Sequence, residues 1–373
     1  MMQRVIVIQR VLPHYRVSFF CGLQEDLKSS GIEFFLIYGQ EHPNTVPKTV
    51  NLVQPWAKRI ENTYLNLGRS RMVWQPCLHL LKGADLVIVE QANTLLLNYI
   101  LLLYRKVEGF KLAFWGHGRN MQARNWPSEK LKRFLINKVD WWFAYTGLTA
   151  GIVEASGFPA EKITVVQNAI DTQEFRRELN GISEEEIRSK RAQLGITSYC
   201  IGLYCGGMYP DKRLGFLIDA CKEVRLKCPE FHLVVIGDGP EQGIVQNAAG
   251  TCEWIHYVGP KFGVERALYF KMSKAFLMPG LVGLAILDAF TAGIPIFTTD
   301  IPIHSPEISY LQNGKNGFMT SPVVEEYAES VAAYLTSSDL QEIVKSAALE
   351  AGLSYTIKDM VSRYRAGIIE WLR

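Results

Sequence analysis

Short apolar runs alternate with longer amphipathic stretches through the first half of the chain. Near-continuous apolar runs of strand length are typical of parallel strands that are buried on both faces of a sheet. The Leu-rich stretch 95–103 contains Asn98 and is too short to span a bilayer, so we expect a buried helix there. The strands expected in this half are 5–9, 33–38, 85–90, 111–115 and 141–145.

The same alternation returns in the second half, after the pattern breaks around residues 165–175. A chain of 373 residues also exceeds the size at which a single core usually stops growing. The sequence therefore predicts two doubly wound, Rossmann-like α/β domains, 1–170 and 171–355, and a helix at 356–373 that packs back on the first domain. Expected strands here are 199–204, 232–236, 275–278 and 296–298, and expected helices are 213–227, 264–273 and 283–292.

Charge is divided unevenly between the two halves. Residues 1–170 carry 20 Lys and Arg against 12 Asp and Glu, whereas residues 171–373 carry 20 against 25. The stretch 126–143 places basic residues opposite apolar ones at helical spacing, which is typical of a solvated helix face. Contact with an anionic membrane surface is our second interpretation of this basic half. We do not expect nucleic acid binding, because no aromatic and basic module of a known kind is present.

The cysteines and the first residues bear on where the protein works. The seven cysteines form no Cys-x-x-Cys pair, and reduced thiols in a cytoplasmic protein are the simplest interpretation. The opening residues, MMQRVIVIQR, have too short an apolar run for a signal peptide. There is no Asp-x-Asp to hold a cation on a nucleotide and no Gly-x-Ser-x-Gly elbow. We expect a cytoplasmic protein, at most peripheral at the inner membrane face, that needs no metal or cofactor.

The densest chemical signal is MPGLVGLAILDAFTAGIPIFTTD at 278–300. A strand is expected to end at Met278, with a Pro-Gly turn and a helix that begins near Val282 or Gly283. The unpaired N–H groups and positive dipole end of such a helix would cradle a diphosphate. Asp288, on the second helical turn, would accept hydrogen bonds from ribose hydroxyls. The alternative is an ordinary strand–turn–helix unit.

This segment resembles the donor-site motif of retaining GT-B glycosyltransferases of family four, the glycosyl transferases of group 1. Their pattern is Pro-Ser-x-x-Glu-Gly-Phe-Gly-Leu-x-x-x-Glu-Ala, followed by Gly-x-Pro-Val. The resemblance extends through VVQNAIDTQEF (165–175), VVIGDGPE (234–241) and ISYLQNGKNGFM (308–319). It implies two Rossmann-like domains that face each other across a cleft, with the acceptor on the first and the nucleotide-sugar on the second.

The resemblance also implies a reaction. A hexosyl or N-acetylhexosaminyl group would pass from a UDP- or GDP-sugar to a hydroxyl of a glycan or lipid-linked oligosaccharide, with retention and without a metal. Surface polysaccharide synthesis, of O-antigen or capsule, is the expected context. Two rival functions stay open: a sugar-nucleotide-binding protein without turnover, and an NAD-dependent oxidoreductase.

This chain departs from the family pattern at two places. The first motif glutamate falls on Gly280, and the second is replaced by Asp288. YCGGMYPDKR (204–213) resembles the family loop Gly-Arg-Leu-x-x-x-Lys-Gly, with Gly207 at the arginine position and Lys212 at the lysine position. Arg213 would supply the missing guanidinium. These departures motivate the non-catalytic alternative and leave the donor sugar and base open.

The loop GDGPEQG (237–243) motivates the oxidoreductase alternative. It nearly fits the dinucleotide pattern Gly-x-Gly-x-x-Gly, but Gln242 stands at the third glycine position. In a nucleotide-sugar site it would instead line the base and ribose pocket with residues 257–262. The candidate donor-binding residues are Gly206, Gly207, Arg213, Gly237, Asp238, Val258, Pro260, Phe262, Gly280, Leu281, Val282, Gly283 and Leu284.

Two loops of the first half carry the remaining candidates. WGHGRN (115–120) places His117 between glycines after a strand, and the resemblance implies that this histidine faces the donor sugar. LPHYR (12–16) follows the first strand and offers polar groups to a phosphate, with plain surface residues as the alternative. The candidate catalytic residues are His117, Lys212 and Asp288, and the acceptor or phosphate candidates are His14, Arg16, Gly118 and Asn120.

Overall fold

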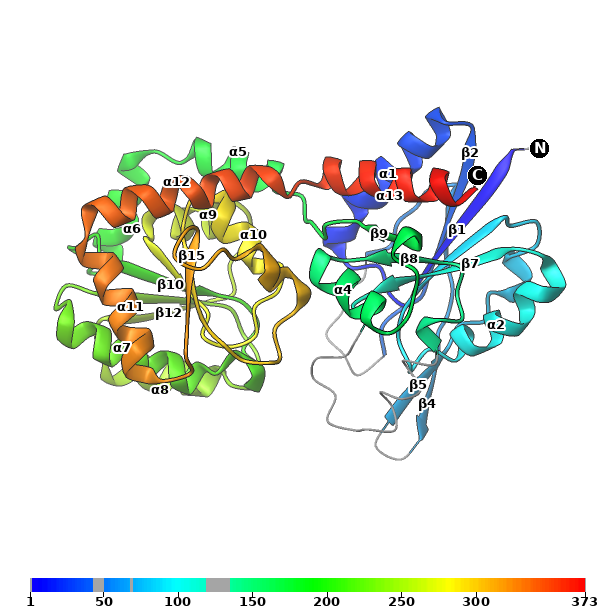
Figure 1. Ribbon diagram of the computed structural model, residues 1–373. Helices are drawn as coiled ribbons and strands as arrows, with labels where there is room; N and C mark the ends of the chain where they lie inside the picture. Colours follow the sequence, from blue (N-terminus) through cyan, green and yellow to red (C-terminus); the bar gives the residue numbers. More distant parts are fainter. Residues whose placement is uncertain (1, 43–49, 68–69, 119–134, 373) are drawn as a thin grey trace. The chain divides into compact units, whose positions relative to one another are not determined.

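The structure, a computed structural model, describes every residue except 1, 43–49, 68–69, 119–134 and 373 (Figure 1). It divides into two compact units. Unit 1 comprises Met1–Ile170 and Ile357–Arg373, and unit 2 comprises Asp171–Thr356. No helix in the described part of the chain is long and apolar enough to cross a membrane.

Unit 1 is built on a seven-stranded parallel sheet with the order β3-β2-β1-β6-β7-β8-β9 among the described residues. A separate antiparallel hairpin, β4-β5, was not predicted from the sequence. The order reverses between β1 and β6, so polar loops from both strands gather at the same carboxyl edge. The strands are β1 Gln3–Gln9, β2 Ile32–Tyr38, β3 Ala57–Arg59, β4 Thr63–Leu67, β5 Ser70–Trp74, β6 Leu86–Glu90, β7 Lys111–Gly116, β8 Trp141–Ala144 and β9 Ile163–Val165.

Helices cover both faces of this sheet. On one face, α1 packs on α13, whose Tyr364 ring stacks on Phe143 at 4.3 Å between centroids (Figure 1). On the other face, Leu97 and Leu101 of α2 join a core that includes Ile6 and Val87. The helices are η1 His14–Arg16, α1 Val17–Ser29, η2 Leu78–Leu80, α2 Leu96–Glu108, α4 Gly147–Ala155, η3 Ala160–Lys162 and α13 Ile357–Leu372.

Unit 2 has a six-stranded parallel sheet with the order β12-β11-β10-β13-β14-β15. Counted from β10, this is the 3-2-1-4-5-6 order of a Rossmann fold. The order reverses between β10 and β13, and ligands of such sheets bind beyond the carboxyl ends of the strands at that point. The strands are β10 Ile201–Cys205, β11 His232–Ile236, β12 Ile255–Gly259, β13 Ala275–Leu277, β14 Ile296–Thr299 and β15 Gly317–Thr320.

The helices of unit 2 begin where local sequence favours them. Ser183 and Glu186 form a reciprocal capping box at the start of α6, which satisfies two N–H groups of its first turn. The helices are α5 Gln173–Gly181, α6 Glu184–Gln193, η4 Pro210–Lys212, α7 Leu214–Lys227, α8 Gln242–Thr251, α9 Gly263–Met272, α10 Ala285–Thr291, η5 Pro306–Tyr310, α11 Val324–Thr336 and α12 Ser338–Ser354. The predicted fold class of two doubly wound α/β domains is confirmed.

Candidate functional site

Three loops meet beyond the carboxyl ends of β11, β10 and β13 in unit 2. The Met208 N–H donates to the Asp238 carbonyl oxygen (2.7 Å), and the Glu241 N–H donates to the Met208 carbonyl oxygen (3.0 Å). On the other side, the Leu281 N–H donates to the Asp211 carbonyl oxygen (2.8 Å). The loop after β10 is therefore held on both sides, at the point where the strand order reverses.

Glycines allow this close approach of the three loops. A Cβ on Gly237, whose φ is 133°, would lie 1.9 Å from the Gly206 carbonyl oxygen. A Cβ on Gly280 would lie 2.3 Å from the Asp211 carbonyl oxygen and 2.5 Å from the Lys212 Cα. A glutamate of the family pattern therefore has no room at Gly280. Gly207 also lies close to its own loop, against the Tyr209 ring.

Two cations stand at this point with neutral hydrogen-bond partners. The Lys212 Nζ donates to the Leu281 carbonyl oxygen and lies 3.7 Å from the Met278 Sδ. The Arg213 Nη1 donates to the Thr299 hydroxyl (3.0 Å). Among the described residues neither cation forms an ion pair, so both charges remain available to an anion.

Burial changes the proton affinity of Lys212. The side chain is half-buried, and loss of solvent lowers its pKa to about 8, although neighbouring Asp211 favours the charged form. An anion beside the ammonium would reverse this shift. Arg213 has a φ of 56°, an uncommon value for a residue with a side chain, and its guanidinium lies over the Phe216 ring at 4.4 Å.

The helix after β13 begins later than the sequence predicted. Residues 281–284 are not helical, and α10 starts at Ala285. The Leu281 N–H is bound by Asp211, and the Val282 N–H donates to the His304 Nδ1 (3.1 Å). The predicted cradle of helix N–H groups is therefore wrong at these two positions. Gly283 and Leu284 complete the turn into the helix.

His304 was not predicted as part of the site. It is buried, and its Nε2 lies 2.7 Å from the Thr299 carbonyl oxygen. Since Nδ1 accepts from Val282, the proton belongs on Nε2 and the ring is neutral. Burial lowers its pKa, which agrees with that state. The neutral His304 ring therefore holds the loop that contains Val282 and supplies no charge to a ligand. No motif spacing in the sequence identifies His304 as part of the site.

Asp288 lies where the sequence did not place it. It is in the first turn of α10 and is buried, with its carboxylate paired to Arg266 of α9. Arg266 Nη1 lies 3.0 Å from Oδ2, and Nη2 lies 3.3 Å from Oδ1. Burial raises the pKa of Asp288, and Arg266 opposes that shift. The predicted position on the second helical turn is wrong, and the ion pair with Arg266 was not foreseen; the ribose contact stays a prediction.

The loops after β11 and β12 border the same edge. The Tyr257 hydroxyl donates to the Gly237 carbonyl oxygen (3.1 Å). Val258 is half-buried, Pro260 is exposed, and Phe262 is 80% exposed just before α9. The Gly-rich loop follows β11, the second strand of the Rossmann order, whereas a dinucleotide fingerprint follows the first. Its position disfavours the oxidoreductase alternative.

In unit 1, both candidate histidines follow strands at the carboxyl edge of the sheet, His14 at the start of η1 and His117 on the loop after β7. His14 is exposed and its ring meets Tyr15 edge-on, at 5.9 Å between centroids. His117 is exposed after β7, 4.5 Å from the Tyr145 ring. Gly118 has a φ of 69° and is buried. The candidate Asn120 lies outside the described residues.

Arg16 does not serve as the phosphate contact predicted for it. The side chain is buried, and its Nη2 donates to the Asn168 Oδ1 at 2.6 Å. Its guanidinium carbon lies 5.0 Å from the Trp115 ring centre and 5.6 Å from that of Tyr145. Aromatic faces and an amide stabilise this charge, and no ion pair of Arg16 is found among the residues that the structure describes. Arg16 therefore anchors the start of α1 within unit 1.

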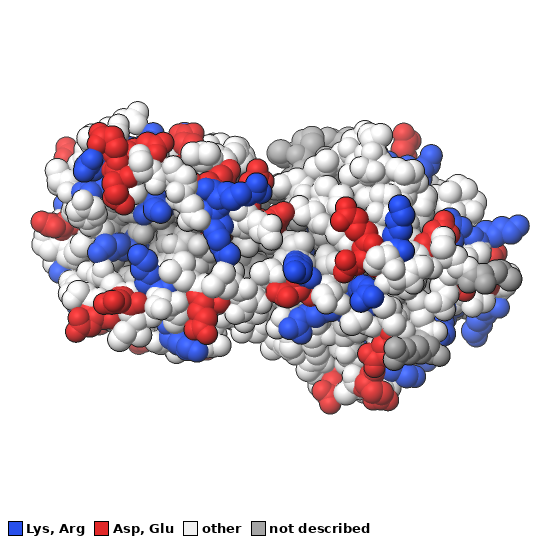
Figure 2. Space-filling view, turned by 90° about the horizontal axis from the view of Figure 1, so that it is seen from above, with Lys and Arg blue, Asp and Glu red and all other residues white. Residues whose placement is uncertain are grey.

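The basic stretch considered for membrane contact falls largely outside the described residues, which resume at Leu135. On the face shown in Figure 2, basic and acidic side chains are interspersed over both units. Among the described residues, no group of three or more His, Cys, Asp or Glu side chains is arranged to hold a metal ion.

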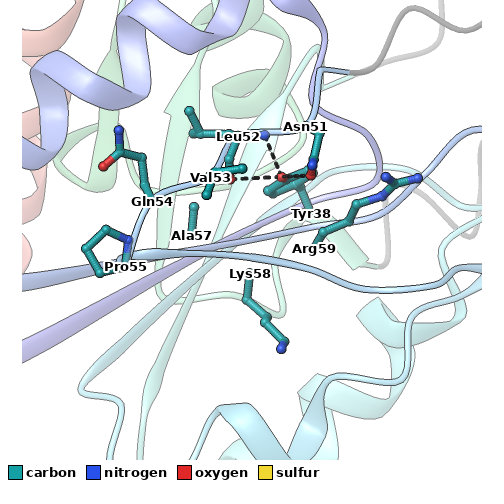
Figure 3. A pocket seen from close by; sticks show the side chains of 9 residues that line it. All are labelled: Tyr38, Asn51, Leu52, Val53, Gln54, Pro55, Ala57, Lys58 and Arg59. Carbon is teal, nitrogen blue, oxygen red and sulfur yellow. Dashed lines mark hydrogen bonds between the residues drawn. The ribbon is translucent and has the colours of Figure 1, made fainter.

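A hollow of about 470 Å³ lies in unit 1, against β2 and β3 (Figure 3). The Tyr38 hydroxyl accepts from the Leu52 N–H (2.8 Å) and so ties the neighbouring loop to the sheet. Lys58 and Arg59 occupy successive strand positions and point apart in Figure 3, as the period of a strand requires. These two cations line the hollow and none of its described lining residues is acidic, but it contains no residue predicted from the sequence as part of a site.

Comparison with known proteins finds a family model within unit 2 and similar structures that cover both units. Residues 200–337 match the family model described as glycosyl transferases group 1. The sulfoquinovosyl transferase SQD2 of Arabidopsis thaliana is 25% identical over 232 residues, 59% of this chain and 43% of that protein. A putative colanic acid biosynthesis glycosyltransferase, WcaL of Salmonella typhimurium, is 23% identical over 239 residues, 60% of this chain and 54% of that protein.

The chain thus spans about half the length of the curated relatives it matches. A solved structure, Anabaena Alr3699/HepE in complex with UDP, aligns with a TM-score of 0.72 at 14% identity. That alignment covers 99% of this chain and all of the other. This chain therefore has the GT-B fold and resembles the glycosyl transferases of group 1.

Proposed function

We propose that this chain is a glycosyltransferase that moves a sugar from a nucleotide-sugar to a hydroxyl of a glycan or lipid-linked acceptor. The observation that carries the proposal is the position of Lys212 and Arg213. Both cations lie where the strand order of unit 2 reverses, and both are bound by neutral groups. A diphosphate placed there would meet two positive charges that no carboxylate compensates among the described residues.

In the proposed reaction, these two cations stabilise the leaving diphosphate. As the bond between sugar and diphosphate breaks, negative charge grows on the leaving oxygen. Lys212 and Arg213 are held by the protein before that charge appears, so they stabilise it without reorganisation. In this proposal they take the part that a metal ion plays in other transferases, and no metal or organic cofactor takes part. The family resemblance supports retention, with the diphosphate assisting deprotonation of the acceptor hydroxyl.

We propose UDP as the carrier and a hexosyl or N-acetylhexosaminyl group as the sugar. The support is the match to HepE, whose structure holds UDP. The similarity to WcaL, a putative colanic acid biosynthesis glycosyltransferase, supports an acceptor of the polysaccharide class, with O-antigen or capsule as the specific proposal. Such an acceptor would place the reaction at the cytoplasmic face of the membrane, and unit 1, with His117 and His14 exposed at its carboxyl edge, would bind it.

The test measures release of the nucleoside diphosphate from a donor in the presence of a lipid-linked acceptor fraction. The donors are UDP-glucose, UDP-galactose, UDP-N-acetylglucosamine and GDP-mannose. We expect acceptor-dependent release of UDP from one donor, unchanged by a chelator. The Lys222→Ala variant is a matched control, since this lysine of α7 is exposed and paired with Asp219 at 3.0 Å. Acceptor-dependent release that requires an added divalent metal would refute the metal-independent mechanism.

A protein that binds a nucleotide-sugar without turnover is the second candidate. The observation in its favour is Gly280, where the backbone of the Lys212 loop leaves no room for the family glutamate. Calorimetric binding of UDP, together with no release from any donor and acceptor fraction, would favour this candidate. A thermal shift with NAD but not with UDP or GDP would instead revive the oxidoreductase reading.

A further inference from the structure

The ion pair between Arg266 and Asp288 joins two helices next to the proposed nucleotide site. Its two contacts, 3.0 and 3.3 Å, run from separate guanidinium nitrogens to separate carboxylate oxygens. This bidentate arrangement fixes the plane of the carboxylate as well as its charge. Burial raises the pKa of the Cys205 thiol at the end of β10, and the nearby Asp288 carboxylate raises that pKa further. The pair therefore sits at the base of the loops that hold Lys212 and Arg213.

The pair is supported from one side by α5. The Arg266 guanidinium carbon lies 4.4 Å from the Phe175 ring centre, so one face of the cation is covered by an aromatic ring. The Asp288 side chain is 12% exposed and that of Arg266 is 26% exposed. Neither group is sealed completely from solvent. A ligand above the sheet edge can therefore reach the pair, while the protein fixes its orientation.

We propose that Arg266 is a positioning residue for the nucleotide: it keeps the Asp288 carboxylate ionised and oriented so that its remaining lone pairs accept hydrogen bonds from ribose hydroxyls. This inference rests on the proposed function. A carboxylate has about four acceptor positions, and a bidentate arginine takes two of them. The two that remain match the two adjacent hydroxyls of a ribose. An unpaired carboxylate with only this small exposed fraction would tend to take up a proton instead.

The decisive experiment compares UDP with 2′-deoxy-UDP on the full-length chain and on Arg266→Gln. We expect the unmodified protein to bind UDP about tenfold more tightly than the deoxy form, since one good hydrogen bond to a charged acceptor is worth about that much. Arg266→Gln should weaken UDP binding and reduce the preference to less than about threefold. Equal losses for the two ligands would overturn the proposal, because a purely structural role does not distinguish them.

Two further variants control for general disruption. Arg266→Lys keeps the positive charge but loses the planar, bidentate guanidinium. Compared with Arg266→Gln, it should recover part of the UDP affinity but less of the preference for UDP over 2′-deoxy-UDP. Lys271→Gln removes another cation of α9, whose Nζ donates to the Leu179 carbonyl oxygen of α5 (3.1 Å) and does not touch Asp288. It should leave the ligand preference unchanged. A preference lost equally in Lys271→Gln would refute the assignment to Arg266.

A pH profile gives an independent readout. Among the described residues, the titratable groups that interact with Asp288 are Arg266 of α9, Glu178 of α5 and Cys205 of β10. Without the Arg266 charge, burial would favour the protonated carboxyl. The defect of Arg266→Gln relative to the unmodified protein should therefore shrink as pH rises from 5 to 8. A constant ratio would contradict the proposal.

These outcomes separate the inference from the proposed function. If the unmodified protein binds neither UDP nor GDP, the proposed function fails and the role of Arg266 fails with it. If it binds UDP and transfers sugar but shows no preference for the ribose 2′-hydroxyl, only the inference about Arg266 fails.

Discussion

Two cations at the carboxyl edge of each sheet have different kinds of partner. In unit 1, Arg10 lies 3.8 Å from the Glu90 carboxylate, and Arg16 is enclosed by aromatic rings and Asn168. In unit 2, Lys212 and Arg213 bind a carbonyl oxygen and a hydroxyl. In the part of the chain that the structure describes, Arg10 and Arg16 of unit 1 are thus paired or enclosed, whereas Lys212 and Arg213 of unit 2 keep neutral partners although Arg266 nearby is paired with Asp288.

This difference follows from what each edge would bind. A diphosphate needs positive charge that is already in place, and an ion pair within the protein would compete with it. A sugar hydroxyl or neutral glycan needs hydrogen-bonding groups more than charge, and exposed histidines supply those. Similar folds therefore do not imply similar ligands, because the partners of a few side chains set the charge that a ligand meets.

The largest effect should come from Lys212→Ala. We expect the rate of nucleotide release to fall about 100-fold or more, because a preorganised charge beside the leaving group is lost. The Lys222→Ala control should stay within about twofold. Normal activity in Lys212→Ala would contradict this interpretation of the two edges, since it would show that the Lys212 charge does not contribute to catalysis.

Gly280→Ala tests how closely the loops must pack. Its Cβ would lie 2.3 Å from the Asp211 carbonyl oxygen, so the loop that holds Lys212 must move. We expect a loss of stability of about 1–3 kcal/mol and a clear loss of UDP affinity. Gly250→Ala in α8 has nothing within 4 Å of its Cβ and should be neutral or stabilising. Thermal melts and calorimetry measure both, and normal UDP affinity in Gly280→Ala would contradict the close packing.

Arg16→Met should act on unit 1 alone. Loss of the bond to Asn168 and of the contacts with aromatic rings should lower stability by about 2 kcal/mol. Tryptophan fluorescence suits the measurement, because seven of the eight tryptophans belong to unit 1. UDP affinity should stay unchanged. A stable variant that instead loses phosphate binding would restore the ligand role that the sequence predicted for Arg16.

The smallest expected effect is a pH dependence of UDP binding. The Lys212 pKa is lowered to about 8 by burial, and a bound diphosphate would raise it. Below about pH 7 the amine is protonated in either state, so Lys212 adds no pH dependence there. Above about pH 8, binding requires uptake of a proton, and affinity should fall by up to about tenfold per pH unit. Calorimetry from about pH 7 to 9, above the range in which the phosphate of UDP titrates, would show this, whereas Lys212→Arg should give a flat profile.

Much of the fold was predictable from local pattern. The apolar strands 232–236 and 296–298 lie almost where the structure has β11 and β14, because period and burial act over a few residues. The hairpin β4-β5 was missed, since its strands, TYLNL and SRMVW, have neither a continuous apolar run nor a regular alternation of apolar and polar residues. The start of α10 was misplaced because His304, far along the chain, binds the Val282 N–H.

The sequence by itself determined the repeated α/β pattern and the order of motifs that resemble a nucleotide-sugar domain. Only the tertiary structure decided which charged side chains remain available to a ligand. Arg16 meets Asn168 across 152 positions, and Arg266 meets Asp288 across 22. The physical reason is that charge is compensated by neighbours in space, and burial makes those partners decisive. Motif spacing records which groups are present, whereas packing decides which of them can meet a ligand.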